Sequence, residues 1–186
     1  MTRKTRNLIR LAVAGLLVAA WVLYLRWNTD MDVDEPVAQR ISCVNNLKQT
    51  GLAFRTWALD HDGQYSFNVS TNAGGTMEFC ARGNDGFDRH AATHFEVMSN
   101  ELSTPRILVC PQDKSKHATV DFHGIRPENV TYRLRTGTNI SEAHPNEVLA
   151  VCPIDGNTLY CDGMVVSTNK SDAQRPDRDA MHVGVP

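Results

Sequence analysis

The first 29 residues of the chain contain no acidic residue, since all twenty-one Asp and Glu side chains lie at or beyond Asp30. Five of the nineteen Lys and Arg residues stand at or before Arg26. The rest of the chain therefore has fourteen basic against twenty-one acidic residues, a formal charge of −7. Because nucleic-acid binding depends on a surplus of Lys and Arg, we expect no nucleic-acid partner.

The sequence also lacks the motifs of common metal and catalytic sites. No Glu follows His90 as it does in metalloprotease helices, and no Cys-x-x-Cys pair is present. His90 and His94 are four residues apart, with Asp88 and Cys80 nearby, and two His at that spacing can share a metal ion. Helix packing or solvent exposure explains these histidines better. Asp155, Asp162 and the loop at 83–88 could hold calcium, but they lack the regular spacing of a calcium loop, so a turn-forming role is expected. We therefore predict no catalytic, cofactor-binding or metal-binding residue, no enzyme activity and no small-molecule substrate.

A long apolar run follows the basic N-terminal segment 1–7. Residues 8–25 would form a helix about 27 Å long, close to the hydrocarbon thickness of a bilayer, about 30 Å. Basic side chains precede this span and acidic ones follow it, so we expect a transmembrane anchor with a cytoplasmic N-terminus. A cleaved signal peptide with its site near residues 18–20 remains the alternative. Aromatic rings that favour the membrane interface stand near the end of the span: Trp21, Tyr24 and Trp27.

An amphipathic helix is predicted after an acidic linker at 26–36, ending near Gly63. Its apolar face must be covered, and the short strands predicted beyond residue 105 provide the cover. The pattern predicts an α+β head over 37–167, with a helix on a small antiparallel sheet, and a disordered tail over 168–186. The helix face consists of Ile41, Val44, Leu47, Gly51, Phe54 and Ala58, widened by Leu52, Trp57 and Leu59. The other predicted elements are a loop at 63–89 with a short strand at 76–80, a helix at 90–102, and strands at 106–110, 130–134, 147–152 and 158–161.

The five cysteines would lie outside the cytoplasm, where disulfides persist. Two bridges among five cysteines allow about fifteen arrangements. If Gly156 and Asn157 form a two-residue hairpin turn, Cys152 faces Cys161 at a position where side chains approach closely, although Pro153 opposes this pairing. Some of the cysteines are otherwise small buried thiols. The disulfide candidates are Cys152 with Cys161, and Cys43 with Cys110.

The stretch 41–63 resembles the start of the globular head in bacterial type IV pilin-like proteins, the type II secretion pseudopilins. Segments 105–113 and 148–166 look like the same group's cysteine–proline strand and closing hairpin, so the resemblance covers roughly residues 38–167. It implies an N-terminal helix laid on a small antiparallel sheet, and self-association through the membrane helices. The matching motif is Cys43, Asn46, Leu47, Lys48, Gln49 and Gly51.

One departure from the family concerns processing. Prepilins carry a glycine at the cleavage point and a glutamate shortly after it, whereas here Gly15 lies inside the apolar run and no acid precedes Asp30. We therefore expect an uncleaved, single-pass inner-membrane anchor with a periplasmic head. The expected function is that of a pilin- or pseudopilin-like structural or interaction protein linked to type II secretion, with membrane lipid and proteins as partners. The alternative is a periplasmic metal- or disulfide-dependent enzyme or binding protein on the same head.

Overall fold

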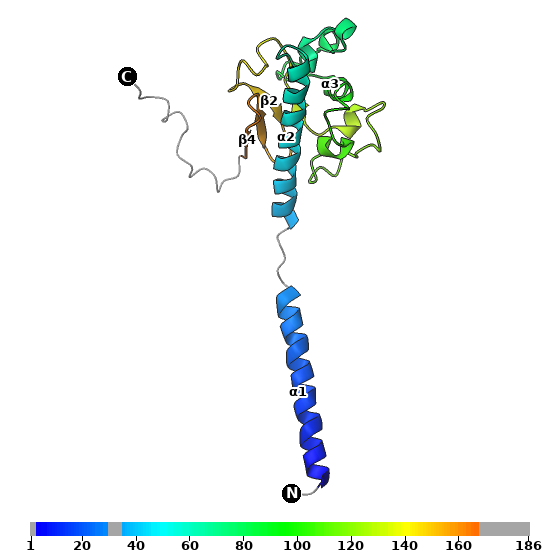
Figure 1. The fold of residues 1–186 in the computed structure, drawn as a ribbon, viewed down its shortest axis with the longest axis vertical. Coiled ribbons are helices and arrows are strands. Elements are labelled where there is room, and N and C mark those ends of the chain that lie inside the picture. The colour runs from blue at the N-terminus through cyan, green and yellow to red at the C-terminus, as the bar shows by residue number, and fades with distance from the viewer. Residues whose placement is uncertain (1–2, 30–34, 168–186) are drawn as a thin grey trace, which may run out of the picture. The chain divides into compact units, whose positions relative to one another are not determined.

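The computed structural model describes residues 3–29 and 35–167, without the side chains of 6–11 and 25–29. The chain divides into two compact units, one up to Val37 and one from Ala38. The predicted α+β class is confirmed, since a long helix and a small four-stranded antiparallel sheet are present (Figure 1). The predicted tail at 168–186 and residues 30–34 of the predicted linker lie outside the described residues.

Helix α1, Arg3–Thr29, covers the predicted anchor at 8–25. Its described side chains from 12 to 24 are all exposed. Among the helices of the described ranges, none combines the length and the apolar character needed to cross a membrane. The predicted span, 8–25, also contains residues 8–11 and 25, whose side chains the structure does not describe.

Helix α2, Glu35–Asp60, is the predicted amphipathic helix. Pro36 stands in its first turn, where a missing backbone N–H leaves no hydrogen bond unmade. Asp62 (φ 52°) and Gly63 (φ 76°) adopt left-handed conformations after its end, and the Gly63 N–H donates to the Ala58 carbonyl at 2.8 Å. That bond satisfies a terminal carbonyl and stops the helix. The buried face consists of Cys43, Leu47, Thr50, Gly51, Ala53, Phe54, Trp57 and Ala58.

Part of the predicted buried face of α2 is wrong. Ile41, Leu52 and Leu59 are 56%, 63% and 81% exposed. Leu52 follows Ile41 by three helical turns, and Leu59 follows Leu52 by two, so the three side chains share a second face of the helix. Apolar spacing detects both faces, but only the tertiary structure shows which of them the sheet covers.

The sheet has the order β1-β2-β3-β4, with all neighbours antiparallel. In the β2–β3 hairpin, Val151 pairs with Thr158 and Val148 with Tyr160, with a bulge between Val148 and Ala150. The strands expected at 147–152 and 158–161 are confirmed within a residue or two at each end. The strands are β1 Arg133–Leu134, β2 Val148–Val151, β3 Thr158–Tyr160 and β4 Val165–Val166.

Three other predicted elements differ in the structure. The strand expected at 106–110 is a 3-10 helix, Pro105–Leu108, because the Thr104 side chain accepts the Arg106 N–H and Pro105 suits a first turn. The helix expected at 90–102 shortens to α3, Ala91–Glu96, and continues as turns. Of the strand expected at 130–134, only Arg133–Leu134 finds a partner strand.

The loop predicted at 63–89 is ordered and built from short turns of helix. The strand expected within it at 76–80 is instead a 3-10 helix, because the Thr76 and Cys80 backbones close local turns around Met77–Phe79. The 3-10 helices of this loop are Ser66–Asn68, Thr71–Ala73 and Met77–Phe79, and another follows at Pro127–Asn129.

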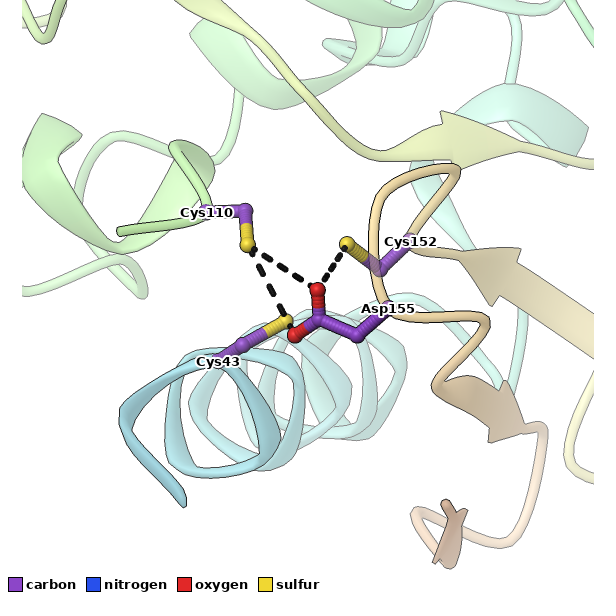
Figure 2. Close-up of side chains that lie close together, drawn as sticks. All are labelled: Cys43, Cys110, Cys152 and Asp155. Carbon is purple, nitrogen blue, oxygen red and sulfur yellow. Dashed lines mark hydrogen bonds between the residues drawn. The ribbon is translucent and has the colours of Figure 1, made fainter. Parts of the chain in front are cut away.

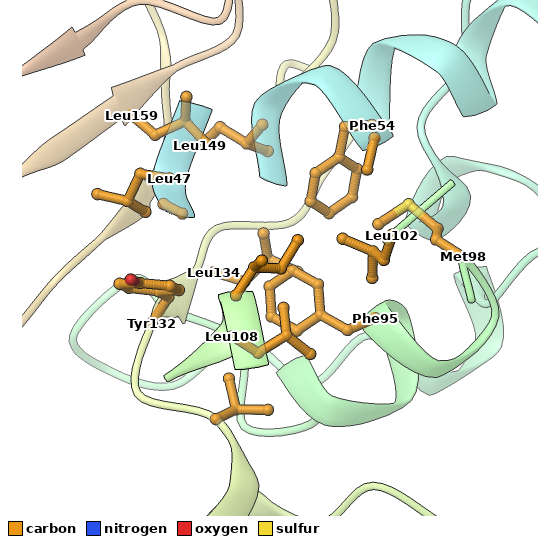
Figure 3. Close-up of a cluster of buried hydrophobic side chains, with 14 of the residues drawn as sticks. Leu47, Phe54, Phe95, Met98, Leu102, Leu108, Tyr132, Leu134, Leu149 and Leu159 are labelled. Atoms are coloured by element: carbon orange, nitrogen blue, oxygen red, sulfur yellow. The ribbon is translucent and has the colours of Figure 1, made fainter. Parts of the chain in front are cut away.

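The hydrophobic core of the head lies between α2, the sheet and the α3 region (Figure 3). Phe54 of α2 is fully buried, with ring centroids 5.3, 5.7 and 5.9 Å from those of Tyr65, Phe67 and Phe95. On the sheet side, Leu149 and Leu159 are fully buried. The loop 63–89 thus contributes aromatic rings to the core and is held in place by their burial.

Close approach of α2 to the sheet requires glycine at position 51. A Cβ on Gly51 would lie 2.8 Å from Leu159 Cδ1, and Leu159 is fully buried, so the side chain has little room to move. We expect Gly51→Ala to lower the free energy of unfolding by about 1–2 kcal/mol, although alanine favours helices. Urea denaturation followed by tryptophan fluorescence measures the change. Exposed Gln49→Ala on the same helix is the control, expected within about 0.5 kcal/mol; a stabilising Gly51→Ala would contradict the close packing.

Candidate metal-binding thiol centre

Three cysteines and one carboxylate meet between α2 and the strands. Each of Cys43, Cys110, Cys152 and Asp155 offers one ligand atom, and these atoms all lie within 4.8 Å of one another. Figure 2 shows Cys43 on α2, Cys110 after the 3-10 helix at 105–108, and Cys152 with Asp155 in the β2–β3 connection. The three cysteines are fully buried. We call this set the thiol centre.

Local hydrogen bonds hold the two loop segments of the thiol centre. The Cys110 N–H donates to Thr131 Oγ1 at 3.1 Å. The Cys152 N–H donates to the Asn157 carbonyl at 2.8 Å, and the Gly156 N–H donates to the Cys152 carbonyl at 2.9 Å. Gly156 has φ 72°, a left-handed conformation that glycine adopts without strain. These bonds close a tight connection whose inner side presents Cys152 and Asp155 to α2.

The polar contacts inside the thiol centre are short. The Cys110 thiol lies 3.5 and 3.7 Å from the two carboxylate oxygens of Asp155, and the Cys152 thiol lies 3.7 Å from Oδ1. Asn157 Nδ2 donates to Asp155 Oδ2 at 3.1 Å and orients the carboxylate. The buried Tyr132 hydroxyl donates to Cys43 Sγ at 3.7 Å.

The surroundings keep the three thiols protonated. A hydrogen bond with Cys110, together with burial, raises the pKa of the Cys43 thiol to about 12. A hydrogen bond with Cys152, together with burial, raises the pKa of Cys110 to about 12. Contact with Cys110 lowers the pKa of Cys152, but contact with Cys43 and burial outweigh it and raise that pKa to about 12. At neutral pH the thiols are therefore neutral, and a cation that bound them would displace their protons.

The expected pairing of Cys152 with Cys161 is wrong, because the hairpin has a different strand register from the one expected. The turn is wider than two residues, so that Val151 pairs with Thr158 and the Cys152 N–H reaches the Asn157 carbonyl. Cys152 thus turns toward Cys43 and Cys110, while the carbonyl of Cys161 accepts the Tyr65 hydroxyl at 2.8 Å. The expected approach of Cys43 to Cys110 is present, but both are free thiols, as are Cys80, Cys152 and Cys161.

The histidine-bearing region forms a second cluster. Cys80, Asp88 and His94 offer ligand atoms within 4.8 Å of one another, but His90 is not among them: its Nδ1 contacts the Phe79 carbonyl at 2.9 Å. His94 is fully buried; Nδ1 lies 2.7 Å from Thr76 Oγ1 and Nε2 3.5 Å from Asp88 Oδ1. Burial lowers the pKa of His94 despite the Asp88 carboxylate, which raises it, so the ring is neutral at pH 7.

The residues of the family-like motif serve packing as well as the thiol centre. Cys43 belongs to the centre, Leu47 to the core, and Gly51 to the close approach of helix and sheet. Asn46 Nδ2 donates to the Val109 carbonyl at 3.2 Å and ties α2 to the segment that ends in Cys110. Lys48 and Gln49 are exposed.

The sequence pattern predicted no metal ligand and did not reveal the grouping of the thiol centre, in particular the part of Asp155 in it. A signal was present: Val-Cys-Pro-x-Asp occurs twice, at 109–113 and at 151–155. The carboxylate of the second copy enters the centre, whereas Asp113 of the first accepts the Thr131 hydroxyl at 2.8 Å. The repeat marks two similar loops, but their meeting with Cys43 depends on the fold.

Comparison with protein-family models, with curated proteins and with solved structures finds no match for this chain.

Proposed function

We propose that the chain is a membrane-anchored protein with a pilin-like head that acts through protein–protein contact, as a structural or interaction component linked to type II secretion. The observation that carries the proposal is the two-sided character of α2. One face is buried against the sheet and core, and a second face presents Ile41, Leu52 and Leu59 to solvent. Apolar side chains grouped in this way are typical of interaction surfaces.

The apolar face of α2 extends over several turns. Ile41 and Leu52 are eleven residues apart, and Leu52 and Leu59 seven, which places them on one side of the helix. The basic side chain of Lys48 is exposed on the same helix, whereas the exposed Arg55 is already paired with Glu142 at 2.7 Å. This combination suits a partner, including a second copy of the chain, that offers an apolar face and an acidic group for Lys48.

The proposed membrane anchor rests on the sequence of residues 8–25 and on the exposed apolar side chains of α1. We propose that it crosses the inner membrane once, with the N-terminus in the cytoplasm and the head in the periplasm. Lipid is the surrounding in which these side chains are stable. The exposed large apolar residues of α1 are Val13, Leu16, Leu17, Val18, Trp21, Val22, Leu23 and Tyr24.

N-terminal sequencing of the membrane-extracted chain tests the anchor. We expect the chain to begin at Met1 or Thr2, because the sequence lacks a prepilin cleavage site. A start within residues 8–21 would contradict the uncleaved anchor and support processing.

Site-specific photocrosslinking in the native membrane tests the contact surface. We expect a crosslinker at Ile41 to yield a defined protein adduct, because this exposed side chain lies on the proposed face. The matched control is Ser42, which is also exposed but about 100° around the helix. Equal yields at Ile41 and Ser42, or no adduct at either, would contradict the proposed surface.

A second candidate function is a metal-dependent binding protein or enzyme on the same head. The observation that favours it is the convergence of Cys80, Asp88 and His94. The buried Nε2 of His94 lies 3.5 Å from Asp88 Oδ1 and has no hydrogen-bond partner among the described residues. Metal analysis of the full chain distinguishes this candidate from the proposed interaction protein. A bound metal that His94→Gln removes and Cys110→Ser retains would favour this candidate.

A further inference from the structure

The thiol centre gathers four ligand atoms from three separate segments of the chain at the spacing of a single metal ion. We propose that Cys43, Cys110, Cys152 and Asp155 form a site for one Zn²⁺ ion, which fastens α2 to the β2–β3 hairpin and to the segment around Cys110. The inference does not depend on the proposed function, since it concerns how the head is held together.

The distances in the centre match a tetrahedral ion. With Zn–S bonds of about 2.3 Å and Zn–O bonds of about 2.1 Å, tetrahedral angles place two sulfurs about 3.8 Å apart and a sulfur and an oxygen about 3.6 Å apart. The observed separations of Asp155 oxygens from the Cys110 and Cys152 sulfurs are 3.5, 3.7 and 3.7 Å. All four ligand atoms fall within 4.8 Å of one another, so small movements bring them onto one ion.

The ligand types select the metal. Thiolate sulfur is a soft ligand that suits Zn²⁺ and disfavours Ca²⁺ and Mg²⁺, which take oxygen. Three thiolates and a carboxylate complete a four-coordinate shell, the arrangement of structural zinc sites, in which no position is left for water or substrate. The three cysteines are fully buried and Asp155 is partly buried, and the chain fills all four positions, so the ion's role is structural.

Hydrogen-bond donors around the thiol centre would stabilise the negative charge of its ligands when zinc is bound. Three thiolates, a carboxylate and Zn²⁺ carry a net charge of −2, which buried surroundings must offset. The Tyr132 hydroxyl points at Cys43 Sγ, and Asn157 Nδ2 holds Asp155. These two donors would stabilise the Cys43 thiolate and the Asp155 carboxylate of a zinc-bound centre.

A disulfide is the competing use of the same residues. A bridge between two of the three cysteines would use only two of the four ligand groups and leave the third thiol and the Asp155 carboxylate outside the bridge. A metal ion uses all four groups at once. The number of thiols therefore favours zinc over a disulfide.

Metal analysis of the full-length chain, extracted from membranes in detergent under reducing conditions, tests the proposal. We expect about one zinc per chain, and a loss of about tenfold or more in Cys110→Ser, because three ligands hold zinc far less tightly than four. The matched control is Cys161→Ser, which removes another fully buried free thiol outside the centre and should keep the zinc. A zinc-free chain, a zinc that Cys161→Ser removes, or bound iron with acid-labile sulfide would overturn the proposal.

A second measurement needs no variant and so does not depend on whether Cys110→Ser folds. Adding Co²⁺ to the metal-stripped wild-type chain should produce the visible bands of a tetrahedral cobalt thiolate, which Zn²⁺ then abolishes. A colourless chain would overturn the proposal. So would peptide mapping that finds a Cys43–Cys110 disulfide in protein extracted without reductant and with its free thiols blocked.

Discussion

Replacing Phe54 by alanine is expected to lower the free energy of unfolding of the head by about 3–5 kcal/mol. Phe54 is fully buried, and its ring contacts three other aromatic rings, from Tyr65, Phe67 and Phe95. Removing it leaves a cavity that the surrounding rings fill only partly, since they are themselves held by α3 and the loop 63–89. Urea denaturation of the purified chain, followed by tryptophan fluorescence, measures the loss.

Leu59→Ala is the matched control for Phe54, since it removes a large apolar side chain from the same helix. Leu59 is 81% exposed, so we expect a change within about 0.5 kcal/mol. The control also bears on the proposed contact surface, because Leu59 lies on it. A loss of stability at Leu59 similar to that at Phe54 would contradict the assignment of the two faces of α2.

Replacing Asp88 by asparagine is expected to lower the free energy of unfolding by about 2–4 kcal/mol. One carboxylate oxygen accepts the Ala81 N–H at 2.9 Å and the Thr136 hydroxyl at 2.7 Å, and the other accepts the His90 N–H at 2.7 Å. The amide of asparagine turns an NH₂ group toward at least one of these donors. The carboxylate therefore holds the loop before α3 against the segment after β1.

The pH dependence of the Asp88 effect follows from its ionisation. Burial alone would raise the pKa of the carboxyl, but hydrogen bonds from Thr136, His90 and Ala81 outweigh it and lower the pKa below its usual value. A carboxyl with a lowered pKa stabilises the fold above its unfolded pKa, about 3.9, and loses that contribution as pH falls through the folded pKa. The difference between wild type and Asp88→Asn should thus be constant near neutral pH and narrow below about pH 4.

Asp121→Asn is the control for Asp88. Asp121 is exposed and accepts the His123 N–H at 3.0 Å, so the expected change is within about 0.5 kcal/mol. A difference between wild type and Asp88→Asn that persisted unchanged at low pH would contradict the role of the ionised carboxylate.

Several features of the head follow from local chemistry in the sequence. The start of α2 next to Pro36 and its end just before Asp62–Gly63 depend on backbone preferences of a few neighbouring residues, so they could be predicted. The same is true of β2 and β3, whose apolar runs flank a turn at Asp155–Asn157. The segment 105–108 shows where such reasoning fails. Its apolar residues are compatible with a buried strand or a buried 3-10 helix. The helix forms because the Thr104 side chain caps it and Pro105 suits its first turn.

The sequence by itself thus determined the α+β class, the long helix with Gly51 in its buried face, and the hairpin that follows. Only the tertiary structure decided which face of α2 is covered, because periodicity places side chains on a helix but does not say what packs on them. It alone brought Cys43, Cys110 and Cys152 to one point. These residues are 67 and 42 positions apart in the sequence, so no local spacing links them, and their meeting depends on the hairpin register and the packing of α2.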